Sequence, residues 1–270
     1  AVDRDRWYGA PFDEQGRERE LAPVLRRFFA AMTRLEFHGL KRRVSVGIMI
    51  PKEYRDLARS LHTLGAFSPS LLSLAGSGTN AACHQGTLDY AQPIQIVYTQ
   101  FIANVARALR DVGLPYVYVE SDAEEALLSE LKVLITPCYE FAQRVRWQRL
   151  RAFAANGGKV VYGPALPSED ERFAPHAFVE PESAVLCRGE EDACRELAQR
   201  LAITLEFQPR FVATHGVQTT VHEDDAEPKV VFMVQQEERF VQSELSLPEP
   251  MALVDVLTDE RFEGQASVRV

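Results

Sequence analysis

The stretch "KVLITPCYEF" (132–141) contains the side chain best suited to chemistry, the thiol of Cys138. Its apolar run predicts a buried strand that stops at Pro137, followed by a helix over 139–155. A thiol at such a turn can act as a nucleophile, because a helix N-terminus lowers a thiol pKa. However, Pro137 and Tyr139 stand where a nucleophile elbow has glycines. These bulky flanks favour a packed cysteine, and a catalytic Cys138 is the alternative.

A catalytic thiol also requires a base. None of the histidines stands in a recognisable catalytic context, and His176 in "FAPHAF", after the fourth predicted strand, is the best placed of them. The six histidines are His38, His62, His84, His176, His215 and His222. The sequence therefore does not favour a Cys–His dyad.

The candidate stretches for phosphate binding and metal binding lack the residues that define these motifs. The glycine-rich "LAGSGTNAA" (74–82) lacks a third glycine and a following Gly-Lys-Ser/Thr, which predicts a flexible loop. The acidic clusters at 120–130, 167–173 and 222–228 do not have the spacing of a calcium loop. Solvated helix starts and turns explain these acids, so we predict no cofactor and no metal site.

Composition narrows the class of protein. The chain has 270 residues, of which 46% are apolar and 26% charged, with a net charge of −9, and this is typical of a globular protein with a sizeable core. An acidic chain without a basic stripe argues against nucleic acid as a partner. No apolar run approaches the ~20 residues of a membrane helix, so we predict no membrane association.

The four cysteines, Cys83, Cys138, Cys187 and Cys194, fit no zinc signature. We expect reduced, mostly buried thiols and a cytoplasmic location. A disulfide between Cys187 and Cys194 is the alternative that the sequence leaves open. The charged N-terminus "AVDRDRWYGA" does not suit a secretory signal. It also has no initiator methionine, and the chain ends abruptly at "QASVRV". We therefore expect a piece of a longer polypeptide.

Periodicity divides the chain into three parts. Residues 1–42 form a lead-in with a helix over 21–37. Strands and helices alternate over 43–207, which predicts an α/β domain with a parallel sheet and helices on both faces. Short β-rich segments over 208–270 predict a small antiparallel domain. The long irregular segment 66–93 is a candidate interface.

Several stretches resemble the carboxy-terminal part of a family-42-type glycoside hydrolase, the β-galactosidase group. They are "DRDRWYGAPFDEQGR", "RVSVGIMIPKEYRDLARSLH", "ALRDVGLPYVYVESDAEEALLSELKVLITPCYEF", "LRAFAANGGKVVYGP" and "PEPMALVDVLTDERFEG". In that family a catalytic barrel precedes a domain folded like a class I glutamine amidotransferase, itself flavodoxin-like, and then a small β-sandwich. The resemblance implies that 1–42 leaves a missing barrel, that 43–207 is the amidotransferase-like domain and that 208–270 is the sandwich.

The resemblance also implies a role. No catalytic carboxylate of the family has a matching position here, so the chain is expected to be non-catalytic, to build a homo-oligomer (a trimer) and to form part of an active-site rim. Carbohydrate substrate would be bound only through the missing barrel. Two alternatives stay open: a free-standing amidotransferase-like thiol hydrolase using Cys138, and a carbohydrate-binding β domain presenting Phe232 and Phe240.

Overall fold

The computed structural model describes residues 10–60, 94–207, 211–213, 217–235 and 242–269. The chain forms two compact units: residues 44–209 are one, and residues 1–43 together with 210–270 are the other. We describe each unit by itself.

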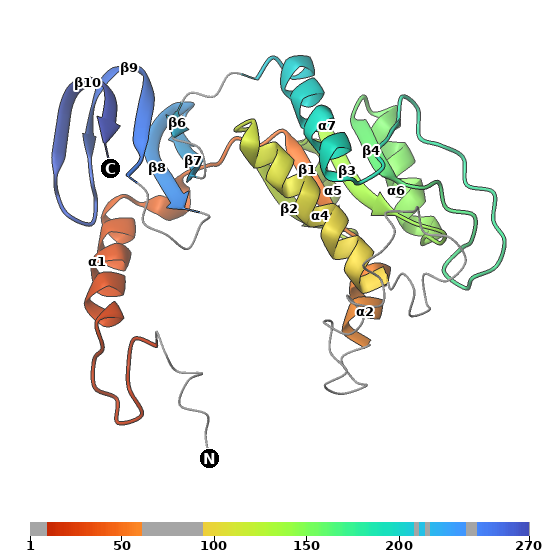
Figure 1. Ribbon diagram of the computed structural model, residues 1–270, viewed down its shortest axis with the longest axis horizontal. Helices are drawn as coiled ribbons and strands as arrows, with labels where there is room; N and C mark the ends of the chain where they lie inside the picture. The colour runs from red at the N-terminus through yellow and green to blue at the C-terminus, as the bar shows by residue number, and fades with distance from the viewer. Residues whose placement is uncertain (1–9, 61–93, 208–210, 214–216, 236–241, 270) are drawn as a thin grey trace. The chain divides into compact units, whose positions relative to one another are not determined.

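The first unit is built on a parallel sheet (Figure 1). Its strands lie in the order β2-β1-β3-β4-β5, and every neighbouring pair is parallel. The strands are β1 (Val46–Ile50), β2 (Tyr116–Glu120), β3 (Val133–Cys138), β4 (Lys159–Pro164) and β5 (Val185–Leu186). The chain adds β2 on one side of β1 and β3 on the other, so the strand order reverses between β1 and β3. The carboxyl ends of these two strands are therefore a topological switch point.

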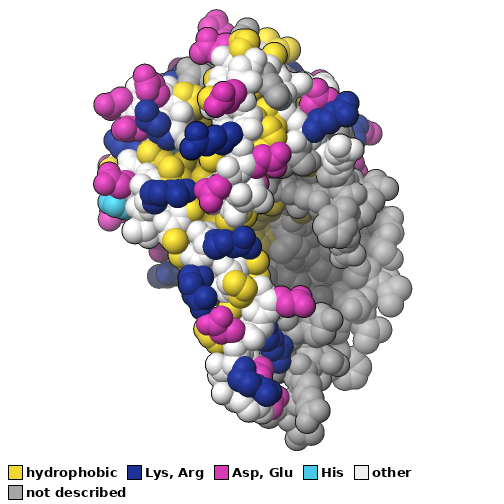
Figure 2. All heavy atoms as spheres, turned by 90° about the vertical axis from the view of Figure 1, so that its left-hand side faces the viewer, with side chains coloured by type: hydrophobic (Ala, Val, Ile, Leu, Met, Phe, Trp, Pro, Cys, Tyr) yellow, Lys and Arg dark blue, Asp and Glu magenta, His cyan; other side chains and the backbone are white. Residues whose placement is uncertain are grey.

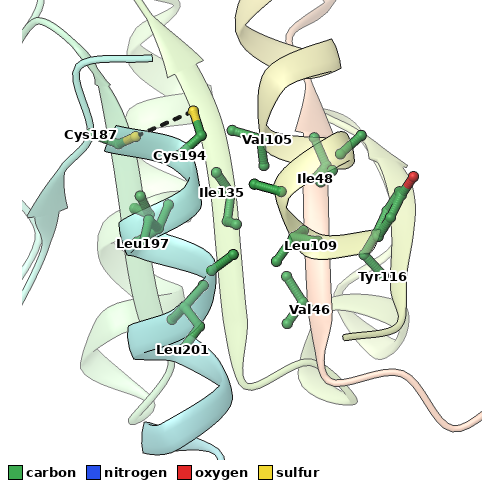
Figure 3. Close-up of a cluster of buried hydrophobic side chains, with 14 of the residues drawn as sticks. Val46, Ile48, Val105, Leu109, Tyr116, Ile135, Cys187, Cys194, Leu197 and Leu201 are labelled. Atoms are coloured by element: carbon green, nitrogen blue, oxygen red, sulfur yellow. Dashed lines mark hydrogen bonds between the residues drawn. The ribbon is translucent and has the colours of Figure 1, made fainter. Parts of the chain in front are cut away.

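Helices cover both faces of this sheet, as the sequence predicts. Because side chains alternate along a strand, Ile48 of β1 packs in one core and Met49 in the other. The first core includes α4 (Ile94–Asp111) and α7 (Glu191–Thr204), whose side chains Leu109 and Leu201 meet the sheet (Figure 3). The second includes α5 (Glu125–Ser129) and α6 (Arg144–Ala155). The remaining helix, α2 (Lys52–Ser60), follows β1 directly. The predicted α/β fold is confirmed.

Two predicted element boundaries are wrong. Strand β3 does not stop at Pro137 but continues through Cys138, which pairs with Pro164 of β4. A proline removes only its own N–H donor, and the carbonyl of Cys138 still accepts from the Ala165 N–H at 3.1 Å. Helix α6 begins at Arg144 instead of directly after Cys138. Cys138 is therefore a strand residue and does not lie at a helix N-terminus.

The second unit contains antiparallel strands, which confirms the predicted small β domain. One sheet has the order β10-β9-β6, and a second sheet pairs β7 with β8. The strands are β6 (Val212–Ala213), β7 (Val217–Asp224), β8 (Glu227–Gln235), β9 (Glu244–Val254) and β10 (Arg261–Arg269). The β9–β10 register shifts between the pairs Ser246–Ser267 and Met251–Gln265. Pro248 and Pro250 fall inside this irregularity, where a missing N–H costs little.

The lead-in segment belongs to this second unit. It contains α1 (Leu21–Arg34) and the short 3-10 helix η2 (Phe37–Gly39). The Phe37 ring lies 4.7 Å from that of His222 and 5.5 Å from that of Phe232, between centroids. Lys41 and Glu223 also form an antiparallel bridge. Residues 1–42 therefore group with the C-terminal strands rather than apart from them. The ring of Phe232 packs against Phe37 and His222. Phe240, the other aromatic residue of the carbohydrate-binding alternative, lies outside the described residues.

Apolar side chains remain on the surface of α1, where Leu21, Val24 and Phe29 are exposed. Figure 2 shows one face of the molecule, on which hydrophobic, basic and acidic side chains are interspersed and no field of one charge forms. Among the described helices, none is long and apolar enough to cross a bilayer.

Candidate active site

Five buried side chains converge at the switch point, where a parallel sheet of this type usually binds its ligand. They come from three elements: Glu53 and Tyr54 from the first turn of α2, Thr136 and Cys138 from the end of β3, and Arg146 from the first turn of α6. Tyr54, Thr136 and Cys138 have no exposed surface. These side chains fill the place that an open cleft occupies in an enzyme of this architecture.

A buried ion pair forms the centre of this cluster. Arg146 Nε donates to Glu53 Oε1 at 2.6 Å, and the exposed fractions of the two side chains are 1% and 6%. Arg146 Nη1 also donates to Thr136 Oγ1 at 3.1 Å, and the guanidinium lies over the Tyr54 ring. Burial alone would lower the pKa of Arg146, but the Glu53, Tyr54 and Cys138 groups beside it raise it. The guanidinium therefore stays charged, held by a carboxylate from a distant part of the chain.

The Tyr54 hydroxyl forms hydrogen bonds with two main-chain groups beside the cluster. It donates to the carbonyl of Phe141 and accepts from the N–H of Tyr139 at 2.9 Å. In a nucleophile elbow, the N–H of the residue after the nucleophile helps to bind the oxyanion. Here that N–H, on Tyr139, is already used inside the protein. A substrate at Cys138 would find this donor occupied.

The Cys138 thiol is held in its unreactive form. Burial raises the pKa of Cys138 to about 11, although Arg146 nearby favours the thiolate. The expected lowering by a helix N-terminus is wrong, because α6 begins only at Arg144 and burial is the larger effect. Among the described residues, the charged and polar groups that act on this sulfur include Arg146, Glu53 and Tyr54, and no described histidine acts on it. A reactive thiol needs a low pKa, and burial keeps the pKa of Cys138 high.

Two of the candidate histidines that the structure describes lie outside this cluster. His176 is exposed, and its ring packs against Phe178 with 4.6 Å between centroids. His222 lies in the second unit, where burial and Arg42 lower its pKa. Several candidates lie outside the described residues: all of segment 66–93 with the glycine-rich stretch 74–82, and also His62, Cys83, His84 and His215.

One acidic residue of the cluster at 167–173, Glu171, caps the N-terminus of α6. The Glu171 carboxylate accepts the N–H of Arg144 at 3.0 Å. That backbone hydrogen bond is the largest effect holding the pKa of Glu171 down, to about 2. Glu53 similarly accepts the N–H of Gln143 at 3.3 Å, so the chain's own carboxylates satisfy the N-terminus of α6. Within the described part of the chain, no three His, Cys, Asp or Glu side chains are grouped to hold a metal ion.

Sequence reasoning missed Glu53 and Arg146, the two charges of the buried cluster. A signal for Arg146 existed. It shares a helical face with Leu150 and Phe153, which are buried on α6, and an arginine in register with a core face is a candidate buried cation. Glu53 carries no comparable signal, because acids are ordinary in the first turn of a helix.

Comparison of the sequence with family models and with curated proteins found no match. Solved structures do match. Gan42B, a GH42 β-galactosidase from G. stearothermophilus, aligns with a TM-score of 0.63 at 15% identity, over 97% of this chain and 44% of that one. The chain has the fold of a part of a GH42 β-galactosidase. The predicted resemblance to a family-42-type glycoside hydrolase is thereby confirmed at the level of the fold.

Two further β-galactosidase structures are covered to a similar share of their length. The β-galactosidase of Bacillus circulans sp. alkalophilus aligns with a TM-score of 0.54 at 12% identity, over 89% of this chain and 42% of that one. The β-galactosidase of Rahnella sp. R3 gives 0.53 at 14% identity, over 89% and 43%. This chain therefore spans less than half the length of each of these three β-galactosidases.

Proposed function

We propose that this chain is a non-catalytic part of a larger β-galactosidase-like glycoside hydrolase, in which it assembles subunits and forms part of the active-site rim. The observation that carries the proposal is the pair of coverages: 97% of this chain aligns with only 44% of Gan42B. In this proposal the catalytic barrel and the carbohydrate-binding residues belong to the rest of the polypeptide.

The filled switch point supports the non-catalytic role. An amidotransferase-like domain that acted as a thiol hydrolase would need an accessible nucleophile, a base and free oxyanion donors. Cys138 is fully buried, its pKa is raised, and the N–H of Tyr139 is occupied. These three features do not favour the alternative of a free-standing thiol hydrolase.

An activity comparison tests the proposal. We expect the reading frame upstream of residue 1 to encode a (β/α)8 barrel that carries two strand-end glutamates. The protein extended by that region should hydrolyse a chromogenic β-galactoside, and residues 1–270 alone should not. The proposal is wrong if residues 1–270 alone hydrolyse the galactoside, or if the extended reading frame encodes no barrel.

The assembly role is a separate part of the proposal and has its own measurement. By resemblance we propose a homotrimer, so light scattering of the purified chain should give three times its mass of 30.4 kDa. Segment 66–93 is our sequence-based candidate for the interface. Deleting it should lower the number of subunits in the oligomer, and an unchanged number of subunits would exclude it as the interface.

We also propose a cytoplasmic location. The cysteines that the structure describes, Cys138, Cys187 and Cys194, are all free thiols, and free thiols are typical of reducing compartments. Fractionation of cells that express the native gene should recover the protein with the cytoplasmic markers, and recovery in a secreted fraction would contradict this.

A further inference from the structure

Two cysteine sulfurs face each other at the end of β5 (Figure 3). Cys187 directly follows β5, and Cys194 lies in the first turn of α7. Their Sγ atoms are 3.9 Å apart, and the residues are 4% and 1% exposed. A disulfide requires an S–S distance near 2.05 Å, so the sulfurs must approach by about 1.9 Å. Side-chain rotation about two Cα–Cβ bonds covers a movement of this size.

The backbone on both sides of the pair is held by its surroundings. The Cys187 N–H donates to the Tyr162 carbonyl at 2.8 Å, and the Cys194 N–H donates to the Glu190 carbonyl at 2.9 Å. Asn104 Nδ2 also donates to the Gly189 carbonyl between them at 3.0 Å. Folding therefore brings the two thiols together and keeps them there, independently of any reaction.

The electrostatic surroundings make one sulfur the better nucleophile. A hydrogen bond with the Cys194 thiol and another from the Gly189 N–H lower the pKa of Cys187, while burial opposes them. The hydrogen bond to Cys187 and burial both raise the pKa of Cys194. This asymmetry suits a reaction in which the Cys187 thiolate attacks the oxidant first and Cys194 then attacks the oxidised Cys187.

We propose that Cys187 and Cys194 form a peroxide-oxidisable dithiol that closes into a disulfide between the end of β5 and the first turn of α7. The oxidant is hydrogen peroxide, which is small enough to reach a buried sulfur. The Cys187 thiolate attacks one peroxide oxygen, the O–O bond breaks, and the hydroxide that leaves takes up a proton to give water. The Cys194 sulfur then attacks the Cys187 sulfenic acid, losing its proton and expelling a second water. Two thiols and one peroxide thus give one disulfide and two waters.

Cys138 serves as an internal control, because it is also buried but has Arg146, Glu53 and Tyr54 around its sulfur and, among the described residues, no facing thiol. Burial alone therefore does not distinguish Cys138 from the pair, whereas the facing sulfur and the lowered pKa of Cys187 do. If burial protected all thiols equally, the three sites would oxidise alike.

Peptide mapping of the whole chain tests the proposal. The chain is treated with hydrogen peroxide, denatured, alkylated and digested with trypsin without reduction. Arg188 separates the two cysteines, and Arg172 and Arg195 define the outer cleavage sites. We expect peptides 173–188 and 189–195 to appear as one linked species, lighter by two hydrogen atoms than their sum, which dithiothreitol separates. Thiols at 187 and 194 should be lost about tenfold faster than the thiol at 138, because Cys187 has the lowered pKa and Cys194 is consumed when it attacks the Cys187 sulfenic acid.

Three variants complete the test. C138S should keep the linked species, and C187S and C194S should each lose it. A linkage that involves another cysteine, irreversible oxidation at Cys187 without linkage, or equal loss of all thiols would overturn the proposal. The wild-type map decides even if a variant does not fold.

Discussion

The carboxyl edge of the sheet has two corners that each bury sulfur completely, and they differ in what surrounds it. At the β1–β3 corner, the Cys138 sulfur lies beside a buried ion pair and a tyrosine hydroxyl. At the β5–α7 corner, the sulfur of Cys187 faces that of Cys194. Exposure is nearly the same at the two corners. The comparison teaches that two thiols buried to a similar extent can differ in chemistry, because one has charged and polar neighbours and the other a second thiol.

The first corner should be the more sensitive to substitution. Arg146→Met leaves the Glu53 carboxylate buried and unpaired, and breaking a buried pair in this way costs about 3–5 kcal/mol. We expect a loss of this size in the free energy of unfolding, measured by urea denaturation. The matched control is Arg144→Met on the same helix, whose ion pair with Glu171 is partly exposed and contributes at most about 1 kcal/mol.

The double variant Glu53→Gln/Arg146→Met sharpens the same point. Removing both charges should recover part of the loss, because the penalty comes from the carboxylate left alone. Equal losses for Arg146→Met and Arg144→Met would contradict the role that we assign to the buried pair.

The raised pKa of Cys138 predicts a pH dependence. Folded Cys138 has a pKa of about 11, whereas an unfolded cysteine titrates near 8.5–9. Between these values the unfolded chain has lost the proton and the folded chain has kept it, so stability falls as pH rises from about 9 to about 11. The loss attributable to Cys138 should be about 2–3 kcal/mol. It is measured as the difference between the wild type and Cys138→Ala, and parallel pH profiles would exclude the effect.

At the second corner, Gly163 determines how closely the chain after β5 approaches β4. A Cβ atom at Gly163 would lie 1.7 Å from the Cys187 carbonyl oxygen, so Gly163→Ala must displace that backbone. We expect a loss of about 1–3 kcal/mol and slower formation of the Cys187–Cys194 disulfide. Gly39→Ala is the control, because its Cβ would have no neighbour within 4 Å. Unchanged disulfide kinetics in Gly163→Ala would show that this contact does not position the sulfurs.

The smallest effect is expected from the hydrogen bond between the Tyr162 hydroxyl and the Glu180 carboxylate. Tyr162→Phe keeps the ring packed against Trp147 and removes only this bond, at a cost of about 1 kcal/mol. Thermal unfolding should show a small shift, and a loss as large as that of Arg146→Met would mean that the hydroxyl has a further role.

The sequence predicts the fold better than it predicts the site, and particular residues show why. The apolar run Val133–Ile135 predicts a buried strand because its pattern is local. The start of α6 depends instead on Glu53, which accepts the N–H of Gln143 across 90 positions, and local propensity contains no such partner. Arg144 and Arg146 are the same residue type two positions apart, yet the first is partly exposed and the second is buried. That difference is set by the helix register against the sheet.

The double hydrogen bond of the Tyr54 hydroxyl has an evolutionary consequence. Replacing this ring to admit a substrate would leave the buried Tyr139 N–H and Phe141 carbonyl without their hydrogen-bond partner. Each loss costs about 1–3 kcal/mol. Arg146 would also have to withdraw before the sulfur met solvent. Converting this corner into a thiol enzyme thus requires changes in three separate segments. Each of these changes, made alone, lowers the stability of the fold and does not by itself give an active thiol.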